Sequence, residues 1–180
     1  MFGSMIKEGL ENEGSRLLGV SVRVASAAAS PFSGQLTVQG LTVANPPGFR
    51  GPEALRIARL EAVASLSAPL DLGEVVADGV DVYLEIGRSG SNLGRLKRGM
   101  ERGHGAGLSI RRLLVRNGAV QARLFGRTAT FPLPDLVIDR VDLRGLVRAL
   151  AAAALGEARK RRARVKGMAR GRKRGAKKAT

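Results

Sequence analysis

The first eighteen residues have the spacing of an amphipathic helix. Apolar side chains recur at steps of three and four, with charged residues such as Lys7 and Glu8 between them. The apolar positions are Phe2, Met5, Ile6, Leu10, Leu17 and Leu18. Gly14 and Gly19 are candidate end points, because glycine favours the backbone conformation that ends many helices. The pattern predicts a short helix over residues 1–18.

From residue 19 to about residue 143 the pattern changes to the alternation that is typical of strands. Residues 80–86 are the clearest case, because apolar residues take every second position and polar residues or Tyr83 lie between them. Similar alternation occurs in residues 20–25, 36–43, 55–66, 108–125 and 133–143. Alternation of this kind predicts a largely antiparallel sheet with one apolar face. The fold class is therefore mainly β, within an α+β arrangement.

Two of the predicted strands change the phase of their alternation part of the way along. Leu36 and Val38 share one face of the first of them. Beyond Gly40 the apolar residues, Val43 among them, fall in the opposite phase, which predicts a β-bulge or bend at Gly40. The two halves of residues 55–66 differ in phase in the same way.

A loose internal recurrence links residues 75–86 with residues 113–125. Both segments contain aliphatic residues, then an Asp-Gly or Asn-Gly pair, and then alternating aliphatic residues. The sequence leaves two interpretations open. The two segments are copies of one supersecondary unit, or they are two hairpin turns, in which Asp-Gly and Asn-Gly are common.

Two further helices are predicted beside and after the sheet. Ser91 or Asn92 can cap a short helix over residues 93–101, inserted between two strands. The Ala-rich residues 144–157 favour a helix after the last strand. The expected organisation is a helix over 1–18, a β domain over 19–143, a helix over 144–157 and a basic tail over 158–180.

The net charge of +16 is concentrated in that tail. Residues 158–180 hold 12 of the 31 Lys and Arg and none of the 15 acidic residues, so the rest of the chain carries 19 minus 15, or +4. Such a tail is solvated and disordered, or it binds anionic lipid headgroups, or it binds nucleic acid. The aromatic content of 3% disfavours nucleic acid, because base stacking needs aromatic rings. The residues expected to meet an anionic membrane or a partner are Arg159, Lys160, Arg161, Arg162, Arg164, Arg172, Lys173 and Arg174.

The sequence contains no recognisable catalytic or metal-binding constellation. It has no Cys, and its single histidine, His104, lies in a Gly-rich segment without a companion ligand. Residues 87–94 resemble a phosphate-binding nest only superficially and fit a turn followed by a helix cap better. Nucleophile elbows, phosphate-binding P-loops and zincin helices do not occur. We therefore expect a protein that is not an enzyme and needs no metal or cofactor.

The run FSGQLTVQGLTVANPPGF, residues 32–49, resembles the N-terminal part of bacterial AsmA-like envelope proteins. The segments EALRIARLEAVASLSAPL, VVADGVDVYLEIG, GSNLGRLKRG and FPLPDLVI follow in the order of that family. In the family pattern a strand leads into an Asn-Pro-x-Gly-Phe turn. The matching residues here are Asn45, Pro46, Pro47, Gly48 and Phe49. The resemblance covers roughly residues 15–142.

The resemblance implies a curved sheet that forms an open groove or half-barrel, as in bridge-like lipid-transfer proteins. Its concave aliphatic face would take acyl chains, and Phe49 would pack down beside the first turn. The residues expected on that face are Leu36, Val38, Leu60, Ala62, Val80, Val82, Leu84, Ile86, Val120 and Leu124. A packed core, with residues 144–157 as a lid, is equally open, because a half-apolar sheet must bury its face against something.

Members of this family are typically held at the inner membrane by one N-terminal helix and project into the periplasm. This sequence has no run of about 20 apolar residues, the length that spans a bilayer, so an anchor is missing or the protein is peripheral. The resemblance implies a periplasmic, inner-membrane-associated protein of a Gram-negative bacterium that binds phospholipid or acyl chains in envelope biogenesis. The alternative is a structural accessory subunit that docks on a protein partner or on a second copy of itself.

Overall fold

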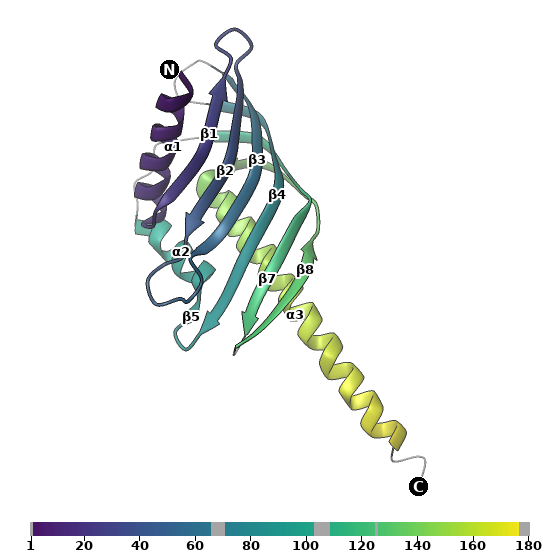
Figure 1. The fold of residues 1–180 in the computed structure, drawn as a ribbon. Helices are drawn as coiled ribbons and strands as arrows, with labels where there is room; N and C mark the ends of the chain where they lie inside the picture. The colour runs from purple at the N-terminus through teal and green to yellow at the C-terminus, as the bar shows by residue number, and fades with distance from the viewer. Residues whose placement is uncertain (1, 66–70, 103–108, 125, 177–180) are drawn as a thin grey trace.

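The described chain forms one large β-sheet and three helices (Figure 1). The computed structural model describes all residues except 1, 66–70, 103–108, 125 and 177–180. The helices are α1 (Phe2–Leu18), α2 (Asn92–Arg102) and α3 (Leu143–Ala176). The strands are β1 (Val22–Ala29), β2 (Gln35–Ala44), β3 (Glu53–Ser65), β4 (Asp71–Gly87), β5 (Gly90–Ser91), β6 (Ser109–Arg116), β7 (Gly118–Leu124), β8 (Arg127–Leu133) and β9 (Leu136–Asp142). The predicted fold class, mainly β with an N-terminal, an inserted and a C-terminal helix, is confirmed.

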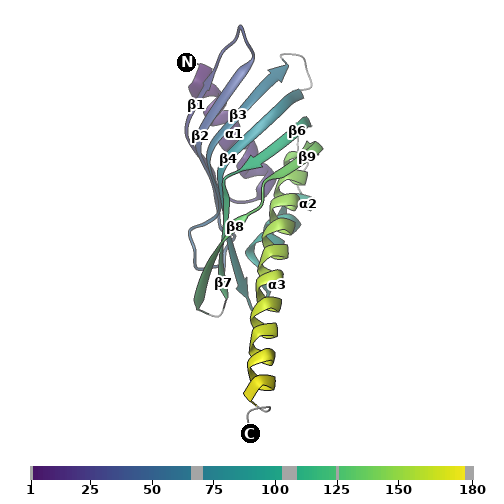
Figure 2. The same ribbon diagram turned by 90° about the vertical axis from the view of Figure 1, so that its right-hand side faces the viewer.

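The strands follow one another across an open sheet. β1, β2, β3 and β4 pair antiparallel in chain order, and β4 then pairs parallel with both β6 and β7. β9 lies beyond β6 and β8 lies beyond β7, both antiparallel. A parallel neighbour requires the chain to cross the sheet, and β5 and α2 occupy this crossover. The sheet is therefore largely antiparallel, as predicted, and its edges do not close into a barrel (Figure 2).

In several neighbouring strands, the alternation between inward- and outward-facing side chains reverses at one position. These positions lie opposite one another and form a line across the sheet. The strand registers place Ala25, Gly40, Ala58, Gly79 and Asn117 opposite one another along this line. Gly40, Gly79 and Asn117 have φ values of 61°, 66° and 51°. A positive φ interrupts the pleat, so the alternation resumes in the other phase. The bend predicted at Gly40 is confirmed, and it belongs to a reversal shared by several strands.

Because of this reversal, apolar residues on both sides of the line point toward the helices. One row of cross-strand partners, all buried, consists of Val22, Val43, Leu55, Val82, Val120 and Phe131. The corresponding row on the other side of the line consists of Ala27, Val38, Leu60, Ala77, Val115 and Leu136. Simple alternation would have placed the two rows on opposite faces of the sheet.

A second reversal crosses β4, β6 and β9. Gly73, Arg111 and Arg140 stand opposite one another, and Arg140 has a φ of 53°. The buried row Leu72, Ile110 and Val141 lies on one side of this second line. The row Val75, Leu113 and Ile138 lies on the other side and faces the same core. This reversal explains the mixed phase of the last predicted strand.

Helix α1 covers the outer edge of strand β1. The backbone N–H of Val22 donates to Ser15 Oγ, and that of Val24 donates to Glu11 Oε1, both at 2.8 Å. Gly3 lies so close to the carbonyl oxygen of Ala27 that a Cβ atom would overlap it. An uncovered edge strand exposes backbone groups to which another chain can pair, and α1 removes this hazard at β1.

The recurrent segments 75–86 and 113–125 lie side by side in the sheet. Val75 pairs with Leu113 and Ile86 with Leu124, in one continuous parallel register. The Asp-Gly and Asn-Gly pairs are therefore not hairpin turns, and that interpretation is wrong. They lie where the first line of reversal crosses two neighbouring strands, with Gly79 opposite Asn117.

Helix α3 is much longer than the helix predicted over 144–157. It begins at Leu143, directly after β9, and continues to Ala176. The additional residues are mostly Ala, Arg and Lys, which favour helix, and they include no proline. Most of the predicted basic tail is therefore a helical extension that runs beyond the sheet (Figures 1 and 2).

We expect Gly79→Ala to destabilise the protein by at least about 2 kcal/mol. A non-glycine residue at positive φ costs about 1–2 kcal/mol, and the new Cβ would lie 2.8 Å from the Cβ of Ala58. Chemical denaturation measures the free energy of unfolding. Adding Ala58→Gly should recover only the part of this loss that comes from the clash between the two Cβ atoms. Gly9→Ala, in open space on α1, should be neutral or stabilising; equal losses at Gly79 and Gly9 would contradict the account.

Candidate functional site

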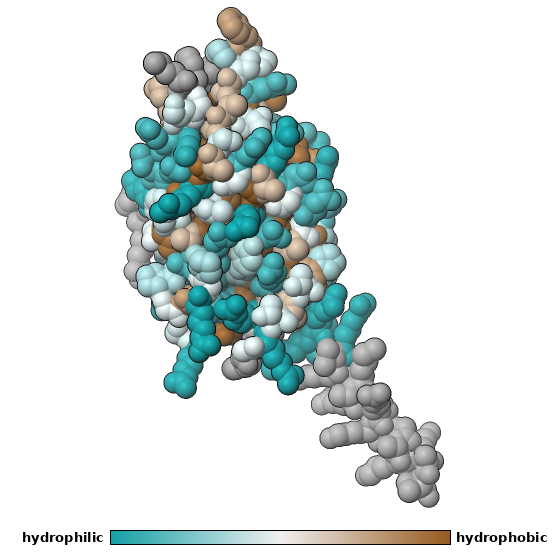
Figure 3. Space-filling view, viewed as in Figure 1, coloured by the Kyte–Doolittle hydropathy of each residue, from teal (hydrophilic) through white to brown (hydrophobic). Residues whose placement is uncertain are grey.

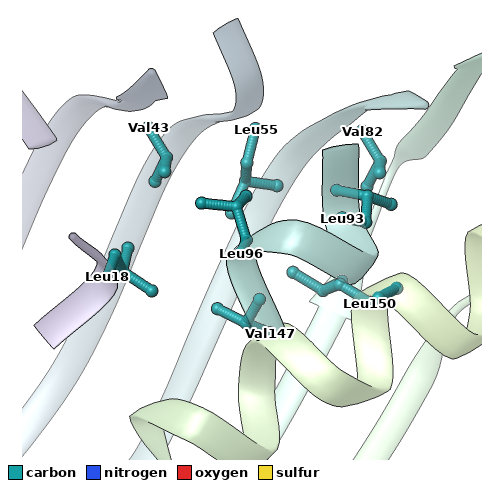
Figure 4. Close-up of a pocket in the computed structure, with 9 residues that line it drawn as sticks. Leu18, Val43, Leu55, Val82, Leu93, Leu96, Val147 and Leu150 are labelled. Carbon is teal, nitrogen blue, oxygen red and sulfur yellow. The ribbon is translucent and has the colours of Figure 1, made fainter. Parts of the chain in front are cut away.

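The candidate site is the aliphatic interface between the sheet and the three helices (Figure 4). Its cavity is lined by Leu18, Val43, Leu55, Val82, Leu93, Leu96, Val147, Leu150 and Ala151. These residues come from α1, β2, β3, β4, α2 and α3. The cavity volume is about 10 Å³, at the lower limit for one water molecule. In this conformation the helices fill the apolar face that an open groove would expose.

Helix α3 closes this interface with small and medium aliphatic side chains. Leu150 and Ala151 are buried, and Ala154 is 0% exposed. Ala152, on the opposite side of the helix, is exposed. Alanine lets the helix backbone approach the sheet closely and loses no side-chain entropy on burial. The face of α3 against the sheet is therefore closely packed, with Leu146, Val147 and Leu150 buried beside the alanines.

The predicted groove residues lie on the face that the helices cover. Val38, Ala62, Val80, Val82, Leu84 and Val120 are buried, whereas Leu36, Leu60 and Ile86 are partly buried against the same core. The side chain of Leu124 lies outside the described residues. In this conformation the other side chains are buried or partly buried on the apolar face of an open sheet.

Several residues of the interface were not among the predicted site residues. Val43 and Leu55 were missed because simple alternation assigns them to the other face, although the change of phase at Gly40 could have indicated their position. On α2, Leu93, Leu96 and Met100 are buried and follow the three- and four-residue steps of an apolar helix face. That spacing was a usable signal in the sequence.

The turn after β2 and the start of α2 meet at a pair of asparagines, of which Asn92 is buried and Asn45 is partly buried. Asn92 is 0% exposed, and its Oδ1 accepts from the Glu85 N–H at 2.9 Å. Its Nδ2 donates to Asn45 Oδ1 at 2.7 Å and to the Tyr83 carbonyl at 2.6 Å. Asn45 Nδ2 in turn donates to the Gly51 carbonyl at 2.9 Å. Through these hydrogen bonds, Asn45 and Asn92 hold the turn after β2 against the start of α2.

The rest of the turn rests on helix α2. Arg95 Nη1 donates to the Pro47 carbonyl at 2.6 Å, and its guanidinium lies 5.6 Å from the ring centroid of Phe49. Phe49 is partly buried and also approaches Gly87. Gly48 has a φ of 94°, which only glycine adopts readily. The motif residues Asn45–Phe49 therefore anchor the turn to α2, and nothing in their contacts requires a ligand.

Glu85 holds the end of the same turn through backbone hydrogen bonds. Its carboxylate accepts from the Arg50 N–H at 2.9 and 3.1 Å and from the Gly51 N–H at 3.1 Å. Burial acts to raise the pKa of this carboxyl, but the two backbone donors and the charges of Arg123 and Arg50 outweigh it. The net effect is a pKa below the ordinary value.

The basic half of α3 lies beyond the interface. Arg159, Lys160, Arg161, Arg162 and Arg164 are exposed, and Arg161 lies 5.6 Å from the ring centroid of Phe131. Arg172, Lys173 and Arg174 belong to the same helix, but their side chains lie outside the described residues. The structure thus joins an apolar helix segment over the sheet to a cationic segment in solvent.

Other candidate chemistry is sparse in the part of the chain that the structure covers. His104 lies outside the described residues. Among the described residues, no three His, Cys, Asp or Glu side chains come together as a metal site. Within the same residues, no helix has the length and apolarity needed to cross a membrane. Comparison with known protein families, curated proteins and solved structures finds no match for this chain.

We expect Ala154→Asp to displace α3 from the sheet. An aspartate there would bury an unpaired carboxylate, which costs several kcal/mol, so α3 should undock or the melting temperature should fall. Ala152→Asp makes the same change on the exposed side of α3 and should leave both properties unchanged. Thermal melting measures the melting temperature, and limited trypsin digestion measures whether α3 is docked on the sheet. Equal behaviour of the two variants would show that α3 does not close the interface.

We expect Glu85→Gln to reduce the dependence of stability on acid. The folded-state pKa of Glu85 is lowered, so its contacts stabilise the fold above the unfolded value of about 4.5 and are lost as pH falls through the folded value. The variant should lose about 0.5–1 kcal/mol at neutral pH and little near pH 3. Denaturation at both pH values tests this, with exposed Glu8→Gln as the control. A loss of equal size at both pH values would contradict it.

Proposed function

We propose that this protein is a non-enzymatic, AsmA-like domain that binds or handles envelope lipid at the periplasmic side of the inner membrane. One observation carries the proposal: the helix-facing side of the sheet is aliphatic except for Phe131, and its cover includes a helix, α3, that continues into the exposed basic residues within 159–164. An aliphatic face suits acyl chains, and a cationic helix suits anionic headgroups. The order of the motifs in the sequence adds the resemblance to the AsmA-like family.

Lipid binding in this proposal requires α3 to move. A cavity of about 10 Å³ has no room for an acyl chain, so the chain would have to replace α3 over the sheet. The face of α3 that would leave carries Leu146, Val147 and Leu150 beside Ala151 and Ala154, so its departure exposes apolar surface on both the helix and the sheet. An acyl chain that covers the same strands would replace the apolar contacts that the sheet loses.

The exposed basic residues of α3, within residues 159–164, would draw the helix toward an anionic bilayer. Each exposed Lys or Arg near an anionic bilayer contributes about 1 kcal/mol of attraction, and residues 159–164 provide five such side chains. Attraction of this segment to headgroups would pull on the same helix that closes the interface. Membrane contact and opening of the apolar face would then be coupled through α3.

A second candidate function is that of a structural accessory subunit in a membrane-associated assembly. The specific observation in its favour is that the apolar face is already filled by the protein's own helices. In that case the helices are permanent parts of the core, and the basic extension of α3 docks on an acidic partner. The two candidates differ in whether α3 ever leaves the sheet.

We expect phospholipid to co-purify with the protein in gentle detergent, detected by lipid extraction and mass spectrometry. Ala154→Asp, with α3 displaced, should retain more lipid than the wild type, whereas Ala152→Asp should match the wild type. Lipid absent from all three folded proteins would overturn the lipid-handling proposal. If the wild type also remained in a protein complex that survives high salt, the accessory-subunit function would replace it.

A further inference from the structure

The hairpin between β1 and β2 presents a completely exposed aromatic ring. Phe32 is 101% exposed, although the whole chain has only five Phe, one Tyr and no Trp. The turn is ordered by its own hydrogen bonds, since the Ser30 N–H donates to the Gln35 carbonyl and the Gly34 N–H to the Ser30 carbonyl, both at 2.9 Å. Phe32 is therefore held away from the sheet by a defined turn, and it does not fold back onto the core.

The part of the β1–β2 hairpin around Phe32 contains no charged residue of its own. Charged residues make up 26% of the chain, yet none occurs between Arg23 and Arg50, a stretch that includes all of β2 and most of β1. The end of β1 is a run of three alanines, Ala27–Ala29, followed by Ser30 and Pro31. In Figure 3 one strongly hydrophobic residue projects at this end of the molecule, above a mixture of weakly hydrophobic and hydrophilic residues.

A second element exposes an apolar side chain at the same end. The first turn of α1 packs on the end of β1, where Gly3 contacts the Ala27 carbonyl. Met5, two residues along this helix, is 69% exposed. The hairpin tip and the N-terminus of α1 therefore lie together at one end of the molecule, and the basic extension of α3 leaves from the other end (Figure 1).

We infer that the tip of the β1–β2 hairpin is a membrane-inserting wedge, whose partner is the interfacial region of a lipid bilayer. Insertion removes apolar surface from water without a desolvation cost for charged groups, because the hairpin end has none. The N–H groups of Ser30 and Gly34 are already paired within the turn, so these two donors lose little when water is excluded. The polar side chains of the tip, Ser30, Ser33 and Gln35, are uncharged and can remain hydrogen-bonded in the interfacial region of a bilayer.

The wedge adds a membrane contact that the proposed function does not contain. The two share only the premise that the protein works at a lipid surface. The cationic segment of α3 needs anionic lipid, whereas an uncharged wedge inserts equally into a zwitterionic bilayer. Neutral vesicles therefore isolate the contribution of the hairpin from that of α3.

The chain without Trp makes a direct test possible. Phe32→Trp introduces a single fluorophore at the tip, and Val137→Trp places one on β9, where the native side chain is 58% exposed on the sheet. With phosphatidylcholine vesicles, the emission of Phe32→Trp should shift to the blue and be quenched by lipids brominated on their acyl chains. The emission of Val137→Trp should stay unchanged.

In the otherwise native protein, Phe32→Ser should lower partitioning onto the same neutral vesicles by about tenfold, the scale expected for loss of one buried aromatic ring. The double variant Arg162→Gln and Arg164→Gln should leave it unchanged. An unshifted Phe32→Trp emission on neutral vesicles would overturn the inference, whatever lipid extraction shows. So would a blue shift that rises with protein concentration and needs no vesicles, because the occupant would then be a second copy of the chain.

Discussion

The structure depends on one constraint: all strands must turn their apolar residues to the same side although their alternation changes phase. Two lines of reversal meet this constraint, one through Gly40, Gly79 and Asn117 and one through Arg140. Without the first line, either the row around Val82 or the row around Ala77 would face water. Gly40 and Gly79 also leave space for the methyl groups of the alanines opposite them. Backbone conformation at a few positions thus decides which side of the sheet is buried.

The helices determine whether the apolar side of the sheet is a closed core or an exposed surface. A half-apolar sheet needs a cover, and here α1, α2 and α3 provide it so fully that the remaining cavity is about 10 Å³. In the lipid-handling proposal, the same residues would line a groove once α3 had moved away. The two proposed functions therefore differ by the position of one helix, whose buried face combines Leu146, Val147 and Leu150 with Ala151 and Ala154.

The motif that first indicated a family has a structural explanation of its own. Asn45 meets Asn92, and Phe49 meets Arg95, so the turn after β2 is fastened to the start of α2. Such a clamp positions α2 over the sheet without any ligand. The surfaces for which we propose membrane contact lie elsewhere, at the hairpin tip and along the extension of α3. They point to opposite ends of the molecule, so in this arrangement they would meet different lipid surfaces (Figure 1).

The sequence by itself determined most of the strands, the positions of the three helices, the bend at Gly40 and the basic character of the C-terminal end, but not strands β5 and β8 or the full length of α3. These features follow from local periodicity, propensity and charge, which neighbours in the chain specify. Only the tertiary structure decided that 75–86 and 113–125 lie side by side and that Val43 shares a face with Val38. It also decided that α3 closes the apolar face. Strand register and helix docking depend on contacts between residues distant in sequence, and alternation alone does not encode where a strand reverses its phase.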